Sequence, residues 1–173
     1  MTDLTKTYWD ACAWLGLINQ EATRYDPLSR IYETARRGGL EIWTSAFTYA
    51  EVFKKKCEAG VIASLDDESE KEISDILSQD FIKIVPVDAI IGTNARKLLR
   101  AHHVLKKPQD AIHLATALWW NLNMLHTYDG SELLPLDGAL PCRDGKMLQI
   151  CVPSDEIIGP LFNVVNQNEA AGK

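Results

Sequence analysis

The amino-acid sequence predicts one α/β domain in which helices cover a parallel sheet. Short β-like runs alternate with apolar helical segments along the chain, and neither an internal repeat nor a dividing linker is visible. Alternating strands and helices form βαβ units, whose strands pair in parallel. The length of 173 residues is sufficient to bury a hydrophobic core without disulfides or structural metals.

The chain begins with one strand and two helical segments. Residues 6–9 are predicted to form a short strand that ends at Asp10, and the apolar segment 11–18 follows it. A second helical segment, 27–37, is followed by two glycines, which are typical of the end of a helix. The sequence therefore predicts that the first strand is followed by two helices.

A second strand is predicted at residues 40–44, which form a β-like run. Either Ser45 or Thr48 is suited to cap a following helix that carries Val52 and Phe53, because a hydroxyl can accept from the free N–H groups of the first turn. Glu51 is expected to lie about two turns into this helix.

The second half of the chain continues the alternation. Residues 81–87 alternate apolar and polar side chains as a strand does, and Asp88 is a suitable N-cap for a helix that reaches about His103. Pro108 fits the first position of the next helix, because proline lacks an N–H and the N–H at that position has no acceptor within the helix. Residues 122–127 are predicted to form a further short strand.

We expect a single domain over residues 1–162. Within it, the acidic region 58–80 is an insertion or helix with a solvated face, and 138–162 is a C-terminal extension that contains the last strand, at 148–152. The polar tail at 163–173 is expected to be disordered.

Composition excludes several classes of protein. No apolar run approaches the roughly 18 residues that a membrane-spanning helix needs, and the start of the chain lacks the pattern of a secretory signal. The 4 cysteines show no metal-type spacing, so free thiols in a reducing cytoplasm are expected. A net charge of −6 argues against broad, non-specific coating of nucleic acid, although it allows a local basic groove.

Four acidic residues fall near the same predicted rim of the sheet. Asp10 comes directly after the first strand, Glu51 lies in the helix after the second, and Asp129 follows the strand at 122–127. Asp110 is at the third position of the helix that Pro108 begins. Ligands of parallel sheets bind beyond the carboxyl ends of the strands, and carboxylate oxygens suit Mg²⁺ or Mn²⁺.

Each acid also has a purely structural explanation. The negative charge of Asp110 is also explained by a favourable interaction with the positive N-terminus of its helix. Asp129, which precedes a glycine, is also explained as a turn residue. Glu51 is compatible with an exposed helix residue. Asp10 is the hardest to explain in this way, because it lies between apolar segments where an unpaired carboxylate is costly.

Other chemistries have weaker support. His113 is suited to be a metal ligand or a base, but a packed or surface histidine explains it as well. The chain contains no GxSxG, P-loop or GxGxxG motif, so acyl transfer, nucleotide hydrolysis and dinucleotide binding lack their usual motifs.

Four segments resemble the motif blocks of a known family. YWDACAWLGL (8–17), TSAFTYAEVFKK (44–55), PQDAIHLATAL (108–118) and LHTYDG (125–130) occur in the order found in PIN-domain proteins, and they look most like those of VapC-type ribonuclease toxins. The resemblance covers about residues 6–137 and implies a PIN-like three-layer α/β/α domain with a central, mainly parallel sheet.

This resemblance also implies a function and a site. Asp10, Glu51, Asp110 and Asp129 would form an acidic Mg²⁺ or Mn²⁺ site of an endoribonuclease, with Asp10 and Asp110 as direct ligands and Glu51 and Asp129 holding a second ion or metal-bound water. The supporting polar residues would be Ser45, Thr48 and Thr127. The RNA backbone would be bound by basic residues, namely Lys54, Lys55, Arg96, Arg100 and Lys107.

The implied partners are an RNA substrate and a cognate antitoxin protein. The Trp119-Trp120 pair is compatible with a homodimer or partner surface, although a buried pair explains it nearly as well. The chain departs from a compact toxin in its length and acidic charge. An alternative is therefore a non-catalytic PIN-like module that binds RNA or protein.

Overall fold

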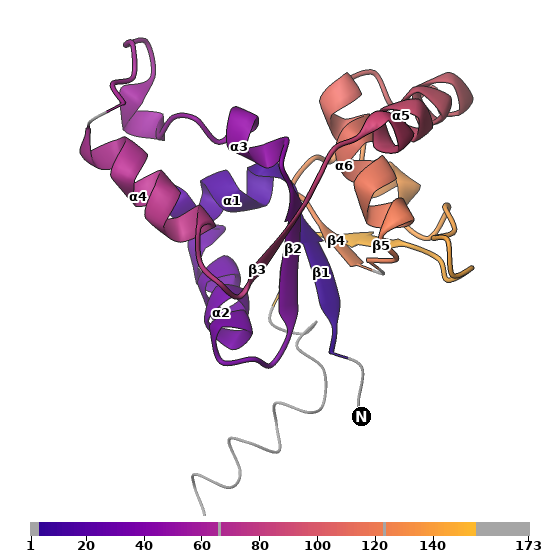
Figure 1. Ribbon diagram of the computed structural model, residues 1–173, viewed down its shortest axis with the longest axis horizontal. Helices are drawn as coiled ribbons and strands as arrows, with labels where there is room; N and C mark the ends of the chain where they lie inside the picture. Colours follow the sequence, from indigo (N-terminus) through magenta and orange to yellow (C-terminus); the bar gives the residue numbers. More distant parts are fainter. Residues whose placement is uncertain (1–3, 66, 123, 155–173) are drawn as a thin grey trace, which may run out of the picture.

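A parallel five-stranded sheet forms the centre of the computed structural model, which describes residues 4–65, 67–122 and 124–154. Its strands are ordered β3-β2-β1-β4-β5, and all pairings between these strands are parallel (Figure 1). The strands are β1 (Lys6–Trp9), β2 (Glu41–Ser45), β3 (Ile82–Val85), β4 (Met124–His126) and β5 (Gln149–Cys151).

Helices cover both faces of this sheet. In Figure 1, α1, α2 and α4 lie on one side of the strands, and α5 and α6 lie on the other. This confirms the expected three-layer α/β/α class. The helices are α1 (Ala11–Ile18), α2 (Tyr25–Arg36), α3 (Thr48–Glu51), α4 (Glu68–Leu77), α5 (Ala89–Ala101) and α6 (Pro108–Trp119), with two short 3₁₀ turns, η1 (Lys56–Glu58) and η2 (Leu134–Leu136).

The central strand β1 supplies the core on both faces, because successive side chains of a strand point in opposite directions. Trp9 packs with Trp14 of α1 in the core under α1 and α2, with ring centroids 4.8 Å apart. Tyr8 joins the core on the α6 side together with Leu114 and Leu125. Both aromatic side chains of β1 are fully buried. This anchoring fixes the end of β1, where Asp10 follows.

Most predicted helix boundaries are confirmed. Asp88 caps α5 by accepting from the N–H groups of Ile90 and Ile91 at 2.9 and 3.0 Å. Pro108 is the first residue of α6, and α2 is followed by Gly38 with a φ of +77°. The acidic region 58–80 contains a loop and the helix α4. The predicted tail at 163–173 and the end of the predicted extension, 155–162, lie outside the described part of the chain.

The helix after β2 differs from its prediction. It is a single turn that ends at Glu51, and neither Ser45 nor Thr48 caps it, since Phe47 occupies the cap position without a side-chain hydrogen bond. Val52 leaves the helical conformation with φ −91° and ψ 60° and is buried in the core. Burial of this apolar side chain outweighs the hydrogen bond that one more helical residue would add. Glu51 is therefore at the end of the helix.

No helix in the described ranges is long and apolar enough to cross a membrane. The last strand begins after a turn at Gly145, whose φ of +84° is a conformation that glycine adopts readily. It pairs with β4 at the edge of the sheet. The part of the C-terminal extension that is described thus adds a strand to the sheet.

His126, the last residue of β4, is a buried histidine inside this sheet. It is 1% exposed, and the indole Nε1 of Trp9 donates to its Nδ1 at 3.1 Å. An Nδ1 that accepts this hydrogen bond leaves the proton of the neutral ring on Nε2. Burial lowers the pKa of His126 to about 4. The folded protein therefore holds this imidazole in its neutral form.

We expect the free energy of unfolding to decrease as the pH falls from 6.5 to about 4, because the unfolded state protonates His126 first. The loss should approach about 3 kcal/mol relative to a His126→Gln variant, which retains an acceptor for Trp9 but does not titrate. Urea denaturation of both proteins between pH 4 and 7.5 measures this difference. Parallel pH profiles would show that the imidazole does not contribute.

Candidate active site

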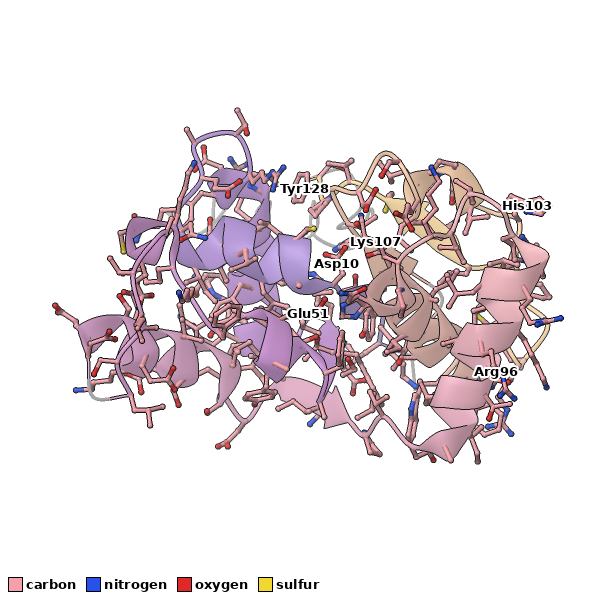
Figure 2. The ribbon with its side chains drawn as sticks, turned by 90° about the horizontal axis from the view of Figure 1, so that it is seen from above. Asp10, Glu51, Arg96, His103, Lys107 and Tyr128 are labelled. Atoms are coloured by element: carbon pink, nitrogen blue, oxygen red, sulfur yellow. The ribbon has the colours of Figure 1, made fainter. Side chains whose placement is uncertain are left out.

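The carboxyl ends of the parallel strands bring the predicted acids to one rim. Asp10 follows β1 directly, Glu51 ends the helix after β2, and Asp129 lies three residues beyond β4. Helix α6 begins at this rim, because the chain has to cross to the opposite edge of the sheet before the parallel strand β4 starts. Asp110 lies in the first turn of α6. Figure 2 shows Asp10, Glu51 and Lys107 close together between the two halves of the molecule.

Asp10 is almost completely buried, at 2% exposure. Its Oδ1 accepts from the N–H of Ala13 at 3.0 Å, so the carboxylate caps α1. Burial raises the pKa of Asp10 above its usual range, which His113 and a hydrogen bond from Thr127 partly counteract, while Glu51 raises it further. Asp10 is thus a desolvated carboxylate with a second carboxylate nearby.

Glu51 is fixed by a short hydrogen-bonded chain. Its Oε2 lies 2.6 Å from Nε2 of His113, and Nδ1 of the same ring lies 2.7 Å from the hydroxyl of Tyr8. His113 is 1% exposed and Tyr8 is fully buried. The two buried rings hold the Glu51 carboxylate in place. The histidine therefore acts as a hydrogen-bond partner of a site acid in this arrangement.

Asp129 organises the turn after β4. Its Oδ1 accepts from the N–H and the hydroxyl of Ser131, at 2.8 and 2.6 Å, and from the N–H of Glu132 at 2.9 Å. Partial burial opposes ionisation, but these hydrogen bonds and Lys107 outweigh it and hold the pKa of Asp129 at about 2. The turn role and the site role proposed for this residue are compatible, because its Oδ2 faces Lys107.

Lys107 places a cation among three carboxylates. Its Nζ lies 3.3 Å from Asp110 Oδ2, 3.1 Å from Asp129 Oδ2 and 3.3 Å from Glu132 Oε1. Burial raises the pKa of Asp110 and Lys107 lowers it, with a net shift upward. The pKa of Lys107 itself is raised, mainly by its hydrogen bond to Asp129. Asp110 and Asp129 are therefore linked through one ammonium group.

Cys12 shows that three of the acids share one neighbourhood. Burial raises the pKa of its thiol to about 12, and the charges of Asp10, Asp110 and Asp129 contribute to the increase. Cys12 lies in the first turn of α1, two residues after Asp10. The three aspartates thus act electrostatically on the same point, although they are separated by up to about 120 positions in the sequence.

The predicted supporting residues are all buried near the ends of the strands. Thr127 donates to Asp10 and accepts from the N–H of Asp129 at 2.9 Å, so it connects two acids. Ser45 lies beside Tyr8. Thr48 lies 2.8 Å from the hydroxyl of Thr44 and does not contact an acid directly in the described contacts.

The predicted basic residues occupy different places. Figure 2 shows Arg96 on α5, set apart from the group of Asp10, Glu51 and Lys107. Arg100 is exposed on the same helix. Lys55 pairs with Glu72 of α4, and Lys54 lies over the ring of Phe53. Of the five basic residues proposed from the sequence, Lys107 is the one that contacts Asp110 and Asp129 in the described part of the chain.

A model of the PIN domain family matches residues 7–131. The chain belongs to the PIN-domain family. A comparison with curated proteins gave no match. Among solved structures, the chain is similar to the VapC20 toxin of Mycobacterium tuberculosis, described as cleaving the sarcin-ricin loop, with 16% identity and a TM-score of 0.56 over 72% of this chain and 90% of that one.

A second similar structure is VapBC2 from Rickettsia felis, bound to a DNA fragment from its promoter. The identity is 17% and the TM-score 0.52, over 72% of this chain and 88% of the other. Both likenesses support the fold. The resemblance expected from the sequence motifs is thus confirmed at the level of the PIN family, and the toxins are structural neighbours of this PIN domain.

Sequence reasoning did not identify three further residues of this PIN domain's rim. Glu132 is 4% exposed and accepts from the N–H groups of Lys106 and Lys107 at 2.7 and 2.9 Å. The Arg24 guanidinium lies over the ring of Tyr128, 4.3 Å from its centroid. Tyr128 could have been found from its place inside LHTYDG. Arg24 and Glu132 carry no such spacing signal.

The donor chemistry of the rim fits a hard divalent cation, because the acids supply carboxylate oxygens. The buried Asp10 carboxylate accepts hydrogen bonds and has Glu51 as a neighbouring acid. A cation would neutralise the negative charge of these two carboxylates. In the conformation described for residues 4–65, 67–122 and 124–154, no three His, Cys, Asp or Glu side chains converge as metal ligands. Lys107 bridges Asp110 and Asp129 instead, so its ammonium would have to move.

An Asp10→Asn variant is expected to be more stable than the wild type in the presence of a chelator at pH 7. Asparagine caps a helix as well as aspartate does but removes the desolvated charge. Since the pKa of Asp10 is raised in the folded state, its ionised form opposes folding at neutral pH. We expect an increase of about 1 kcal/mol or more in the free energy of unfolding.

Thermal and urea denaturation with EDTA measure this increase. Asp88→Asn is the matched control, because Asp88 caps α5 in the same way but is exposed. The control should differ from the wild type by less than about 0.5 kcal/mol. Equal or lower stability of Asp10→Asn would show that burial of this carboxylate does not oppose folding.

Proposed function

We propose that this PIN-domain protein is a metal-dependent endoribonuclease that hydrolyses RNA phosphodiester bonds. The observation that carries the proposal is that carboxylates from four separate segments lie at one rim, at the carboxyl ends of β1, β2 and β4 and the start of α6: Asp10, Asp110 and Asp129 act on the same thiol, and Glu51 acts on Asp10. The likeness to VapC20, described as a toxin that cleaves the sarcin-ricin loop, supports the choice of RNA as substrate.

The acids have distinct roles in this proposal. Asp10 and Asp110 would hold Mg²⁺ or Mn²⁺ directly, and Glu51 and Asp129 would hold a second ion or position water. When bound, such a cation activates water and stabilises charge on the phosphate oxygens. His113 keeps Glu51 oriented through the 2.6 Å contact, and Thr127 orients Asp10 and Asp129 together. Ser45, which lies beside Tyr8, and Thr48, whose hydroxyl lies 2.8 Å from that of Thr44, are assigned supporting roles.

The RNA backbone would be bound by basic side chains around the rim, since lysine and arginine contacts to phosphate position a nucleic acid without reading its sequence. We assign this role to Arg24, which lies over Tyr128 beside the acids. The residues proposed from the sequence, Lys54, Lys55, Arg96, Arg100 and Lys107, are assigned to flanking contacts. For Lys107, this role requires release from its carboxylate partners.

We further propose that the protein acts in the cytoplasm as the toxin of a toxin–antitoxin pair. VapBC2 of Rickettsia felis, a structural neighbour, was solved bound to promoter DNA. An antitoxin would be the protein partner of this chain. The Trp120 side chain, 39% exposed beside Trp43, offers apolar surface for a homodimer or for a protein partner.

Purified wild-type protein is expected to cleave structured RNA in the presence of Mn²⁺ or Mg²⁺. Asp10→Asn and Asp110→Asn should each reduce the rate by about 100-fold or more, because loss of a direct ligand costs at least as much as loss of an outer partner. Gel analysis of labelled RNA at matched protein concentration measures the rate, with circular dichroism as the check of folding.

Asp88→Asn is the control for this experiment and should cleave at the wild-type rate, since Asp88 is an exposed helix cap on α5. Equal cleavage by all variants would indicate a contaminating nuclease and contradict the proposal. RNA binding by the wild type without cleavage, and without Mn²⁺ binding at millimolar concentration, would favour the alternative of a non-catalytic binding module.

The toxin role has its own test. Induced expression of the wild-type chain in a bacterial host should arrest growth, whereas Asp10→Asn at the same protein level should not, because the variant lacks a proposed metal ligand. Colony counts after induction measure the effect. Normal growth with active nuclease would contradict the toxin role and leave the nuclease proposal intact.

A further inference from the structure

Lys107 is bound to the rest of the protein in two separate ways. Its backbone N–H donates to Glu132 Oε2 at 2.9 Å, as does the N–H of Lys106 at 2.7 Å, so Glu132 fixes the peptide just before α6. Its side chain reaches the carboxylates of Asp110, Asp129 and Glu132 at 3.1 to 3.3 Å. The backbone position and the ammonium position are thus determined by different contacts.

The ammonium of Lys107 engages the oxygens that a metal ion would need. It contacts Oδ2 of Asp110 and Oδ2 of Asp129, and both acids belong to the proposed metal site. Oδ1 of Asp129 is already used by the turn at Ser131. A divalent cation that binds Asp129 therefore competes with Lys107 for the remaining oxygen, and the two positive charges repel at such short range.

The side chain of Lys107 is also able to leave. It is 54% exposed, whereas the carboxylates that it contacts are 14%, 12% and 5% exposed. A lysine ammonium is a point charge on a flexible stem with no fixed geometry of its own. Its release needs only rotation of the side chain, because Glu132 continues to hold the backbone.

The three acids need this charge when no metal is bound. Burial raises the pKa of Asp110, and the negative charges of Asp129 and Glu132 raise it further. The ammonium contacts offset this repulsion. Loss of one partner from a group of partly buried charges leaves the others uncompensated. A cation at this place therefore stabilises the metal-free fold.

We propose that Lys107 is the internal counter-ion of the metal-free site: its ammonium holds Asp110 and Asp129 together and is displaced by the divalent cation. The inference rests on the proposed metal-dependent function. It assigns Lys107 a positioning role that opposes metal binding while it protects the empty site from charge repulsion. The displaced ammonium is then free to contact RNA phosphate.

The test is a calorimetric titration of the full chain with Mn²⁺, which measures the affinity for the ion. Lys107→Met keeps the apolar stem and removes the charge, and Lys106→Met is the matched control, because Lys106 is an exposed neighbour that also donates its N–H to Glu132. Lys107→Met should bind Mn²⁺ about tenfold more tightly than the wild type, as expected for removal of a close like charge. Lys106→Met should bind as the wild type does.

Thermal denaturation provides a second readout that needs no activity. With EDTA, Lys107→Met should melt several degrees below the wild type and Lys106→Met, and saturating Mn²⁺ should abolish the difference. Equal or weaker Mn²⁺ binding by Lys107→Met would overturn the displacement, even if wild-type Mn²⁺ binding still supports the proposed function. An unchanged melting temperature in EDTA would overturn the counter-ion role. Absence of Mn²⁺ binding in every variant would overturn the metal-dependent function and displacement together.

Discussion

Repulsion between carboxylates gathered at one rim is the constraint on which the rest of this site depends. Each acid is held by a different means: Asp10 by the N-terminus of α1, Glu51 by His113, Asp129 by its own turn, and Asp110 by Lys107. These anchors use groups from both layers of helices. The parallel sheet supplies the common edge that makes such convergence feasible.

The arrangement separates acids by their electrostatic environment. Burial raises the pKa of Asp10, whereas hydrogen bonds from the turn hold that of Asp129 at about 2. Asp129 is thus a fixed negative charge, and Asp10 is a desolvated one that gains most from a nearby cation. The ionised Asp10 carboxylate opposes folding, and destabilised groups of this kind are common where active sites collect like charges. The aromatic anchors Tyr8 and Trp9 supply core packing on the two sides of the same strand.

Much of the architecture was predictable because local signals agree with the global fold. Asp88 and Pro108 mark the starts of α5 and α6 by hydrogen-bonding chemistry that operates within one turn. The helix after β2 was predicted wrongly, since the burial of Val52 is a tertiary effect that overrides helix propensity. The Glu51–His113 contact joins residues 62 positions apart, so no local pattern could reveal it.

The sequence by itself determined the α/β class, the order of the elements and the acids that follow β1 and β4, because periodicity and capping act over a few residues. Only the tertiary structure decided the partners of those acids. Lys107 was expected at an RNA-binding surface, yet it contacts Asp129, 22 positions away, and Glu132. Contacts of this kind depend on where the ends of parallel strands meet, and that is fixed when the sheet and its helices pack together.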